Sequence, residues 1–570
     1  TYVCFVAFIF TLSRGAWLLF PIAVALLLIV QPPGRRLYML LSIFGVVIIS
    51  VGPAYLFYQA LVLKKSILAP MAYVAGIPLV VLYAWLLERF TLVGFRQKVY
   101  ILSLLTIFAV IVAVTALANG WIPESVTQRV RRISIDEYSA WSRIQWSRDA
   151  WRMIKDRPFF GAGGGAWEAL YFGYQSYGYF TKQVHNHFLQ LWLEVGTVGF
   201  VFWLAIWTSF IWATAYSYCR LADNSEKTLL AGTLVAGLAL GVHSIIDFNL
   251  ALMAVALSLW ALFALVQGFY LRVTDPQDVS TARRTKHRYA HSMGRYVVIA
   301  LSLLFVLGTS VLLAGYDQGQ KGARAMQQGD LRVAATLLDR AMRLDPFNAY
   351  FYFNRATIHE IMVQHGLEDK RALLKARSLM ERGLAYDRYD PNLHAIYGAF
   401  LFRHKEFEDG VAELERAVAL NPFQISRYEV LARAYASLGK LALQKGDRPQ
   451  AEEHMQDVLT ILGRIKAQRE KEPPQVPKHL KLPVMTPKLA LPVGQAYAVL
   501  GDWEKAATHL QQATKVKEQR AEALFWLGMV YESMGDTQEA SKVLAEAYKL
   551  EPRYKEVFEP LLRLLEDKRT

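Results

Sequence analysis

Cysteine is nearly absent from this chain, which has only Cys4 and Cys219 among its 570 residues. Both lie in or beside apolar runs, so the sequence supports neither a disulfide framework nor a cysteine metal site. The first residue, Thr1, already lies in an apolar run, with no methionine and no basic start of a signal peptide. We therefore expect the sequence to be truncated at its N-terminus and to lack one or more earlier membrane spans.

Long apolar runs are absent from the second half of the chain and dominate the first half. Up to about residue 315 they have lengths near 20 residues, roughly what a helix needs to cross the hydrocarbon core of a bilayer. We expect an all-α protein, with a polytopic transmembrane helical bundle over residues 1 to 316 and an α-solenoid over residues 317 to 570. The predicted apolar helices are at 1 to 12, 15 to 31, 37 to 61, 67 to 87, 98 to 118, 187 to 217, 229 to 245, 249 to 271 and 296 to 316.

Acidic residues are outnumbered, 48 against 63 lysines and arginines, which gives a formal net charge of +15. On a soluble protein this excess would suggest nucleic acid as a partner. Here the cations of the short links between spans explain most of it, and we expect no nucleic-acid partner. The positive-inside rule places these links in the cytoplasm. They are residues 32 to 36, 88 to 98, 219 to 227 and 272 to 295.

The opposite, extracytoplasmic side of the membrane then receives every unusual polar cluster of the first half. Lys64 and Lys65, which also fall on that side, are the one short-loop exception to the rule. The features placed there are Ser13 to Gly15, the long loop 119 to 186, His243 to Asp247, and everything after residue 316.

The second half repeats with a period of about 34 residues. Small residues recur where the two helices of a hairpin approach each other, and proline follows the second helix. These spacings resemble tetratricopeptide repeats, which bind proteins and seldom catalyse. A proline- and lysine-rich insertion at residues 470 to 490 is expected to form a hinge or an extended arm. The repeat positions include Gly322, Leu338 and Pro346; Gly398, Leu414 and Pro422; Gly494 and Leu510; and Gly528, Leu544 and Pro552.

The loop 119 to 186 contains nine lysines and arginines against six acidic residues. An external loop has no topological need for cations, so either an anionic ligand or salt bridges within the loop explain them. Residues 139 to 154 have the apolar spacing of an amphipathic helix. Its Arg143, Arg148 and Arg152 are suited to phosphate.

His185, Asn186 and His187 stand at the start of an apolar span. Unpaired polar groups at membrane depth cost several kcal/mol, so such residues are site candidates. Imidazole also titrates near neutral pH, which suits a general base.

The polar elements of the first half occur in an order that resembles the O-antigen ligase and O-antigen polymerase superfamily, over residues 1 to about 270. The most specific element is His185-Asn186, separated by nine residues from Gly196 and then Gly199. The family also has a leucine four positions after its loop arginine, where this chain has Ser147. The elements in order are Ser13-Arg14-Gly15, Arg143, Pro158 with Gly161 and Gly163, His185-Asn186 with Gly196 and Gly199, His243-Ser244, and Asp247-Phe248.

The resemblance implies an inverting glycosyltransferase that uses no metal or other cofactor. Such enzymes move a sugar chain from undecaprenyl diphosphate to an acceptor hydroxyl, on the extracytoplasmic side of the bacterial inner membrane. A lipid diphosphate is a good leaving group, so the protein must supply cations that hold its charge and a base that takes the acceptor proton. The acceptor is a lipid, another glycan or a protein side chain, and the sequence does not distinguish ligase from polymerase.

We assign the base to His185 and the diphosphate to Arg14 and Arg143. The expected supporting residues are Arg148 and Arg152 as further phosphate binders, Asn186 to orient the histidine or a sugar hydroxyl, and His243 with Asp247 as a relay or as a polar break between spans. Gly196 and Gly199 are expected to permit close helix packing. The alternative is a non-catalytic membrane scaffold or transporter of an envelope polysaccharide complex, whose repeats bind protein partners.

Overall fold

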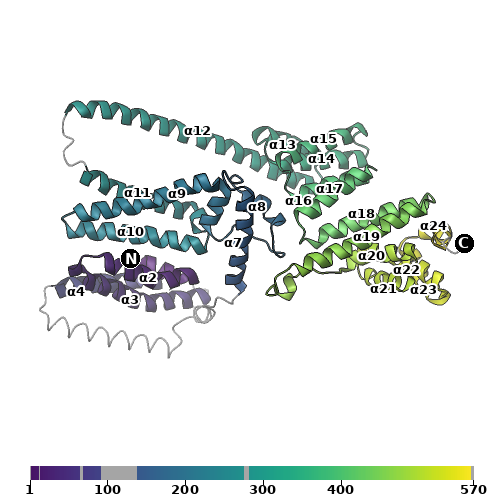
Figure 1. The fold of residues 1–570 in the computed structure, drawn as a ribbon, viewed down its shortest axis with the longest axis horizontal. Coiled ribbons are helices and arrows are strands. Elements are labelled where there is room, and N and C mark those ends of the chain that lie inside the picture. The colour runs from purple at the N-terminus through teal and green to yellow at the C-terminus, as the bar shows by residue number, and fades with distance from the viewer. Residues whose placement is uncertain (1, 12, 64–67, 92–137, 275–280, 567–570) are drawn as a thin grey trace. The chain divides into compact units, whose positions relative to one another are not determined.

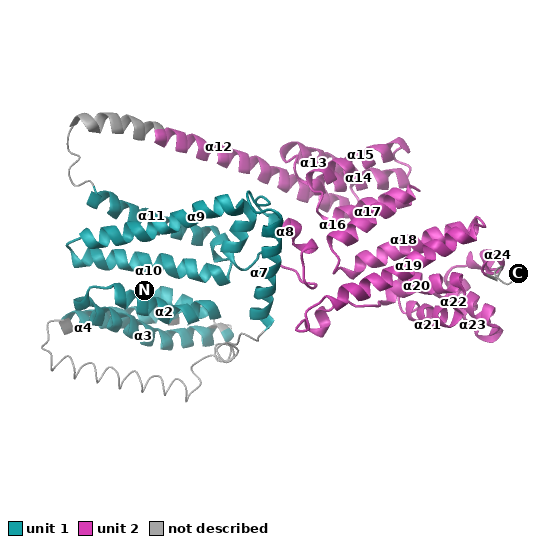
Figure 2. Ribbon diagram, in the orientation of Figure 1, with its two compact units in different colours: residues 1–167, 182–280 teal, residues 168–181, 281–570 magenta. Residues whose placement is uncertain are grey.

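The computed structural model describes residues 2–11, 13–63, 68–91, 138–274 and 281–566. Helices are the main secondary structure of the described residues, which contain no strand, as the sequence predicts. The predicted span at 98 to 118 and the loop residues up to 137 lie outside the described part. By internal contacts the chain divides into two units, residues 1–167 with 182–280 and residues 168–181 with 281–570 (Figure 2).

The first unit contains most of the helices that precede α12 (Thr281–Gln327), coloured teal in Figure 2. Their boundaries lie close to the predicted ones, because each apolar run ends at a polar or helix-breaking residue. These helices are α1 (Tyr2–Phe10), α2 (Arg14–Val30), α3 (Arg36–Val62), α4 (Leu68–Thr91), α7 (Tyr138–Asp156), α9 (His187–Arg220), α10 (Asn224–Ile246) and α11 (Met253–Thr274).

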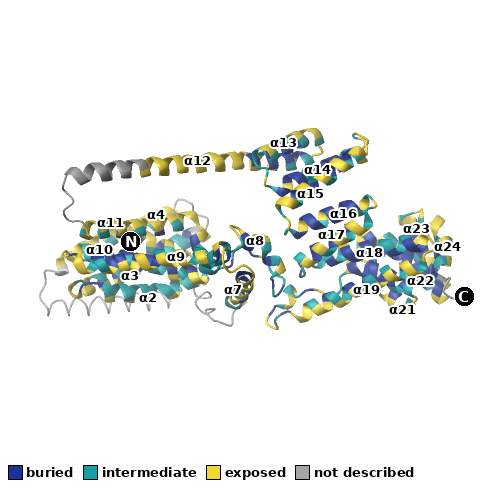
Figure 3. Cartoon of the chain, turned by 45° about the horizontal axis from the view of Figure 1, so that its top comes forward, coloured by how far each residue is buried: buried dark blue, intermediate teal, exposed yellow. Residues whose placement is uncertain are grey.

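Among the described residues, five helical stretches are long and apolar enough to cross a membrane, and Arg14–Val30 is a shorter apolar helix. The chain is therefore a multi-pass membrane protein. The five stretches are Pro33–Ala60, His187–Arg220, Asn224–Ile246, Met253–Thr274 and Gly294–Gln327. The last lies in α12 (Thr281–Gln327), whose apolar residues from 296 to 307 are exposed (Figure 3), as expected of a helix that faces lipid.

Glycines set the packing of α9 against α10. A Cβ atom on Gly237 would lie 2.8 Å from the ring of Phe210, and one on Gly241 would lie 2.6 Å from the ring of Trp207. The two glycines are one helical turn apart, so they form a groove for the two rings of α9. Helix α10 also packs against α2, which brings the start of α2 to the end of α10.

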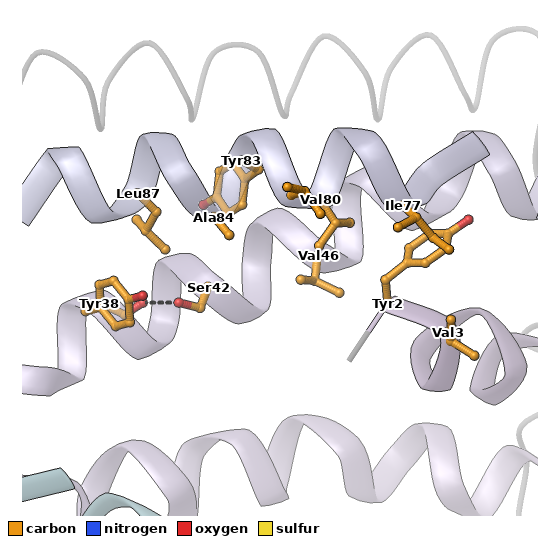
Figure 4. Close-up of a pocket in the computed structure, with 11 residues that line it drawn as sticks. Tyr2, Val3, Tyr38, Ser42, Val46, Ile77, Val80, Tyr83, Ala84 and Leu87 are labelled. Atoms are coloured by element: carbon orange, nitrogen blue, oxygen red, sulfur yellow. Dashed lines mark hydrogen bonds between the residues drawn. The ribbon is translucent and has the colours of Figure 1, made fainter. Parts of the chain in front are cut away.

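A separate cavity of about 370 Å³ lies between α1, α3 and α4. Figure 4 shows its largely apolar lining, with the hydroxyls of Tyr38, Ser42 and Tyr83 among the few polar groups. Ser42 donates to the Tyr38 carbonyl at 2.8 Å. No residue predicted for the functional site lines this cavity.

The second unit is a stack of helical hairpins (Figure 1). The glycines lie where the two helices of a hairpin approach each other, as predicted. A Cβ atom on Gly494 would lie closer than van der Waals distance to Leu510 of the paired helix, and one on Gly528 would lie similarly close to Leu544. The hairpins pair the end of α12 with α13 (Leu331–Leu344), α14 (Ala349–Gln364) with α15 (Arg371–Tyr386), α16 (Pro391–Arg403) with α17 (Phe407–Leu420), α18 (Ile425–Gln444) with α19 (Arg448–Glu470), α20 (Pro487–Leu500) with α21 (Trp503–Ala513), and α22 (Arg520–Met534) with α23 (Thr537–Leu550). A last helix, α24 (Tyr554–Glu566), follows.

The proline-rich insertion is packed rather than extended into solvent. Leu482 is 2% exposed and belongs to the main hydrophobic cluster of the repeats, and its N–H donates to the buried Glu472 carboxylate at 2.8 Å. A short 3-10 turn, η4 (Lys478–Leu480), lies within it. The prolines prevent a regular helix, but Leu482, which lies between them, is still buried in the hydrophobic core of the repeats.

Candidate functional site

Side chains from α2, α7, the start of α9 and the end of α10 meet in the first unit. His185 directly precedes Asn186, whose side chain caps α9 by accepting from the Leu189 N–H at 3.1 Å. His185 itself has φ of 56°, a left-handed conformation that is uncommon for residues other than glycine. Such strain is often retained where it orients a functional side chain.

The imidazole of His185 faces the carboxylate of Asp247, the residue that ends α10. Its Nδ1 lies 3.4 Å from Oδ1 of Asp247, and the two side chains are only 20% and 23% exposed. A nitrogen held towards a carboxylate leaves the opposite ring nitrogen, Nε2, as the basic atom. Sequence order alone separates these two residues by 62 positions, and the fold brings them together.

Arg143 of α7 approaches the same carboxylate. Its Nη2 lies 4.0 Å from Oδ2 of Asp247, and its Nη1 donates to the Ile246 carbonyl at 2.9 Å. Burial raises the pKa of Asp247, but the contact with His185, the Phe248 N–H and the charge of Arg143 outweigh it and hold the pKa of this carboxyl below its ordinary value. Asp247 is thus a carboxylate that links a histidine to an arginine.

Aromatic rings flank the imidazole of His185. The ring of Trp146 lies 5.0 Å away, centre to centre, and the ring of Phe248 lies 4.7 Å away in an edge-on arrangement. Both rings restrict the orientation of the imidazole. Trp146 lies in the predicted amphipathic helix, and no sequence pattern indicated that it borders His185.

The start of α2 adds a second group of contacts. Ser13 Oγ lies 3.3 Å from Nε2 of His243, and Arg14 donates to the Ser139 hydroxyl of α7 at 2.7 Å. A Cβ on Gly15 would lie 2.7 Å from Ile246 and 3.3 Å from His243. The absence of a side chain at Gly15 therefore lets α2 approach the end of α10, and this approach places Arg14 near α7.

Other predicted residues stand apart from this group. Arg152 is paired with Asp149 on its own helix, and nine residues at about 100° each place it opposite Arg143. Arg148 is exposed, and its Nη1 lies 3.2 Å from the side-chain oxygen of Gln145 in the better amide orientation. Of the four arginines predicted to bind diphosphate, Arg14 and Arg143 are the two that the structure brings towards α10.

The glycine-rich turn supports α9. Helix α9 is broken at Gly196, which has φ of 69° and ψ of −177°. The turn fills the break: the Ala162 N–H donates to Leu193 at 2.8 Å, and the Thr197 N–H donates to Pro158 at 2.7 Å. A Cβ on Gly196 would clash with the Phe159 carbonyl oxygen. We predicted that Gly196 permits close packing of a second helix. In the structure it instead makes room for the loop formed by residues 158 to 163.

Comparison with known families identifies part of the membrane half and part of the repeats. A family model described as O-Antigen ligase matches residues 56–204, a range that contains Arg143 and His185 and ends before His243. Tetratricopeptide-repeat models match residues 320–361, 494–535 and 521–554. The chain therefore combines an O-antigen ligase-type domain with tetratricopeptide repeats, which confirms the predicted architecture. No curated protein matches the chain.

Solved structures resemble the chain in part. PilF of Pseudomonas aeruginosa is 20% identical, with a TM-score of 0.31 over 43% of this chain and 97% of its own. PilW, a type IV pilus biogenesis factor, is 19% identical, with a TM-score of 0.29 over 44% and 98%. A thermophilic TPR protein of Thermus thermophilus is 22% identical, with a TM-score of 0.27 over 38% and 98%.

Proposed function

We propose that this protein is a membrane glycosyltransferase of the O-antigen ligase type. It moves a glycan from undecaprenyl diphosphate to an acceptor hydroxyl on the extracytoplasmic side of the bacterial inner membrane. The observation that carries the proposal is the contact of His185 with Asp247, 3.4 Å apart, within reach of Arg143. The O-Antigen ligase model that matches residues 56–204 supports the reaction class.

The proposed reaction needs one proton acceptor and one stabilised leaving group. Nε2 of His185 takes the proton of the acceptor hydroxyl as its oxygen bonds to the anomeric carbon. The bond from that carbon to the diphosphate oxygen breaks, and the lipid diphosphate leaves with the electron pair. Asp247 holds Nδ1 and stabilises the charge that the imidazole gains.

The guanidinium groups of Arg143 and Arg14 are our proposed diphosphate binders. Arg143 presents a rigid, planar set of donors to phosphate oxygens. It is held at Ile246 and Asp247, so little side-chain entropy is lost when the donor binds. Arg148 and Arg152, which stand apart from Asp247 on α7, are left out of the proposed diphosphate site.

A replacement of His185 by alanine tests the proposal in cells. In a strain that depends on this gene for a surface glycan, His185→Ala should abolish glycan transfer at normal protein levels. His365→Ala is the matched control, since His365 is exposed in the repeats. Normal transfer by His185→Ala would refute the proposal and favour the non-catalytic scaffold or transporter.

A further inference from the structure

One stretch of the membrane half belongs to the repeats. Residues 168–181 lie in the middle of the loop that carries the candidate site, between Trp167 and Lys182, yet by internal contacts they group with residues 281–570 (Figure 2). The stretch is rich in aromatic residues, with the sequence Tyr171-Phe172-Gly173-Tyr174-Gln175-Ser176-Tyr177-Gly178-Tyr179-Phe180. We call residues 168–181 the strap.

The strap contacts two parts of the repeat array. Its 3-10 turn η2 (Tyr171–Gly173) contacts α17, and a Cβ on Gly173 would lie 3.8 Å from the carbonyl oxygen of Leu420. A Cβ on Gly178 would lie 3.6 Å from both the Phe423 Cβ and the Leu480 carbonyl oxygen. The strap thus lies between the turn that joins α17 to α18 and the proline-rich insertion.

The strap has buried aromatic side chains of its own, as a folded segment does. Tyr171 and Tyr177 are 1% and 0% exposed, and both rings pack against Tyr179, at 5.7 Å and 4.9 Å between ring centres. Burial raises the pKa of the Tyr171 hydroxyl to about 12, although a hydrogen bond with the Thr181 backbone opposes the shift. These ring contacts lie within the strap and stabilise its own folded conformation.

The strap is tied closely to the candidate site by the chain itself. Only Lys182, Gln183 and Val184 separate it from His185. Val184 is fully buried, and its N–H donates to the Gln190 side chain at 3.3 Å. A restraint on the strap is therefore a restraint on the backbone that holds His185 in its left-handed conformation.

We propose that the repeat array binds the strap of its own chain, and that this contact holds the His185 loop in its working conformation. The strap-binding surface consists of the end of α17, Phe423 and Leu480. It gives the proline-rich insertion a role, since Leu480 belongs to that insertion. The effect on transfer rests on the function proposed above, whereas the docking itself does not.

A designed disulfide tests the docking. In a Gly178→Cys/Phe423→Cys double variant, the two cysteine Cβ atoms would lie about 3.6 Å apart, which is within the range of native disulfides. We expect most full-length molecules to form this bond under mild oxidation, detected by mass spectrometry as a linked peptide pair. The control pairs Gly178→Cys with Ser541→Cys, an exposed position in α23, and should not cross-link. Failure of the first pair, or equal cross-linking of both, would overturn the proposal.

The effect on transfer has its own measurement. A Cβ at position 178 would lie 3.6 Å from the Leu480 carbonyl oxygen and 3.7 Å from the Phe423 carbonyl oxygen, so Gly178→Glu puts a long charged side chain into this contact and should reduce glycan transfer about tenfold or more. Gly463→Glu, in α19 with nothing within 4 Å of its Cβ, should leave transfer unchanged. The cross-linked Gly178→Cys/Phe423→Cys protein should transfer within about twofold of its reduced form. Normal transfer by Gly178→Glu, or loss of transfer on cross-linking, would refute a working role for the docked strap.

The two proposals fail in different ways. If His185→Ala transfers normally while the designed disulfide still forms, the glycosyltransferase proposal is wrong and the docking stands. If His185→Ala is inactive and no disulfide forms, the docking is wrong and the proposed reaction stands.

Discussion

At the scale of single residues, Asp247 is the centre of the candidate site, because its carboxylate contacts two of the proposed functional residues. This carboxylate contacts His185 of one segment and Arg143 of another, and it also ends α10, where its side chain accepts from the Phe248 N–H at 2.8 Å. Asp247 thus both ends a helix and contributes to the proposed chemistry of His185. Its replacement by asparagine keeps the shape and removes the charge.

Asp247→Asn should reduce the kcat of glycan transfer about 100-fold and raise KM far less, because Arg143 keeps its hydrogen bond to the Ile246 carbonyl. The neutral amide still fits beside His185, but it no longer stabilises the charge that the imidazole gains in the transition state. Steady-state kinetics with purified protein check this split. A kcat within twofold of the wild-type value would remove Asp247 from the mechanism.

At the scale of elements, the kink of α9 at Gly196 is the feature on which the His185 segment depends. Gly196 has a φ/ψ combination that is essentially restricted to glycine. The Pro158 to Gly163 turn occupies the space beside it. The kink divides α9 into a short segment after His185 and a long apolar span.

Gly196→Ala should destabilise the protein by about 2 kcal/mol or more, because it combines backbone strain with a clash against the Phe159 carbonyl. Thermal unfolding of the full-length protein in detergent measures the loss. Gly268→Ala is the matched control, since nothing lies within 4 Å of its Cβ. Equal stability of the two variants would contradict the role of the kink.

The repeats contain an acidic residue that joins three hairpins. Glu522 of α22 accepts from Lys440 of α18 at 2.6 Å and from Gln495 of α20 at 2.8 Å. Burial raises the pKa of Glu522, but Lys440, Gln495 and Arg433 outweigh it and hold the pKa below its ordinary value. A carboxyl with a lowered folded pKa stabilises the fold above its unfolded pKa, and this stability is lost as pH falls through the folded pKa.

Glu522→Gln should therefore lower stability by roughly 1–2 kcal/mol at pH 7 and by less at pH 4. Thermal unfolding of full-length wild type and variant at both pH values measures the difference. A deficit that is the same at both values would show that the carboxylate charge does not contribute.

At the scale of the whole molecule, sequence patterns predicted most of the architecture and part of the site. Spans follow from run length, and the repeat hairpins follow from glycines that meet leucines of the paired helix. Three features were not predictable, because each depends on contacts between distant segments. They are the kink at Gly196, the rings of Trp146 and Phe248 around His185, and the packing of the strap with the repeats.

The proposed topology places the repeats and the candidate site outside the cytoplasm. With Cys4 and Cys219 replaced by serine, Ser541→Cys in the repeats should react with a membrane-impermeant maleimide once the outer envelope is permeabilised. Asn224→Cys, in a proposed cytoplasmic link, should react only after the inner membrane is opened. Both positions are exposed. The reverse pattern would place the site in the cytoplasm and exclude the proposed reaction.

The central claim is that His185 is the base of a glycan transfer from a lipid diphosphate. Its most direct test is transfer by purified full-length protein from an undecaprenyl-diphosphate-linked glycan to an acceptor, with donor binding measured in parallel. The account predicts that wild type transfers the glycan, and that His185→Ala binds the donor equally well but transfers roughly 1000-fold more slowly, within the typical range for loss of a general base. Transfer by His185→Ala at the wild-type rate would contradict it.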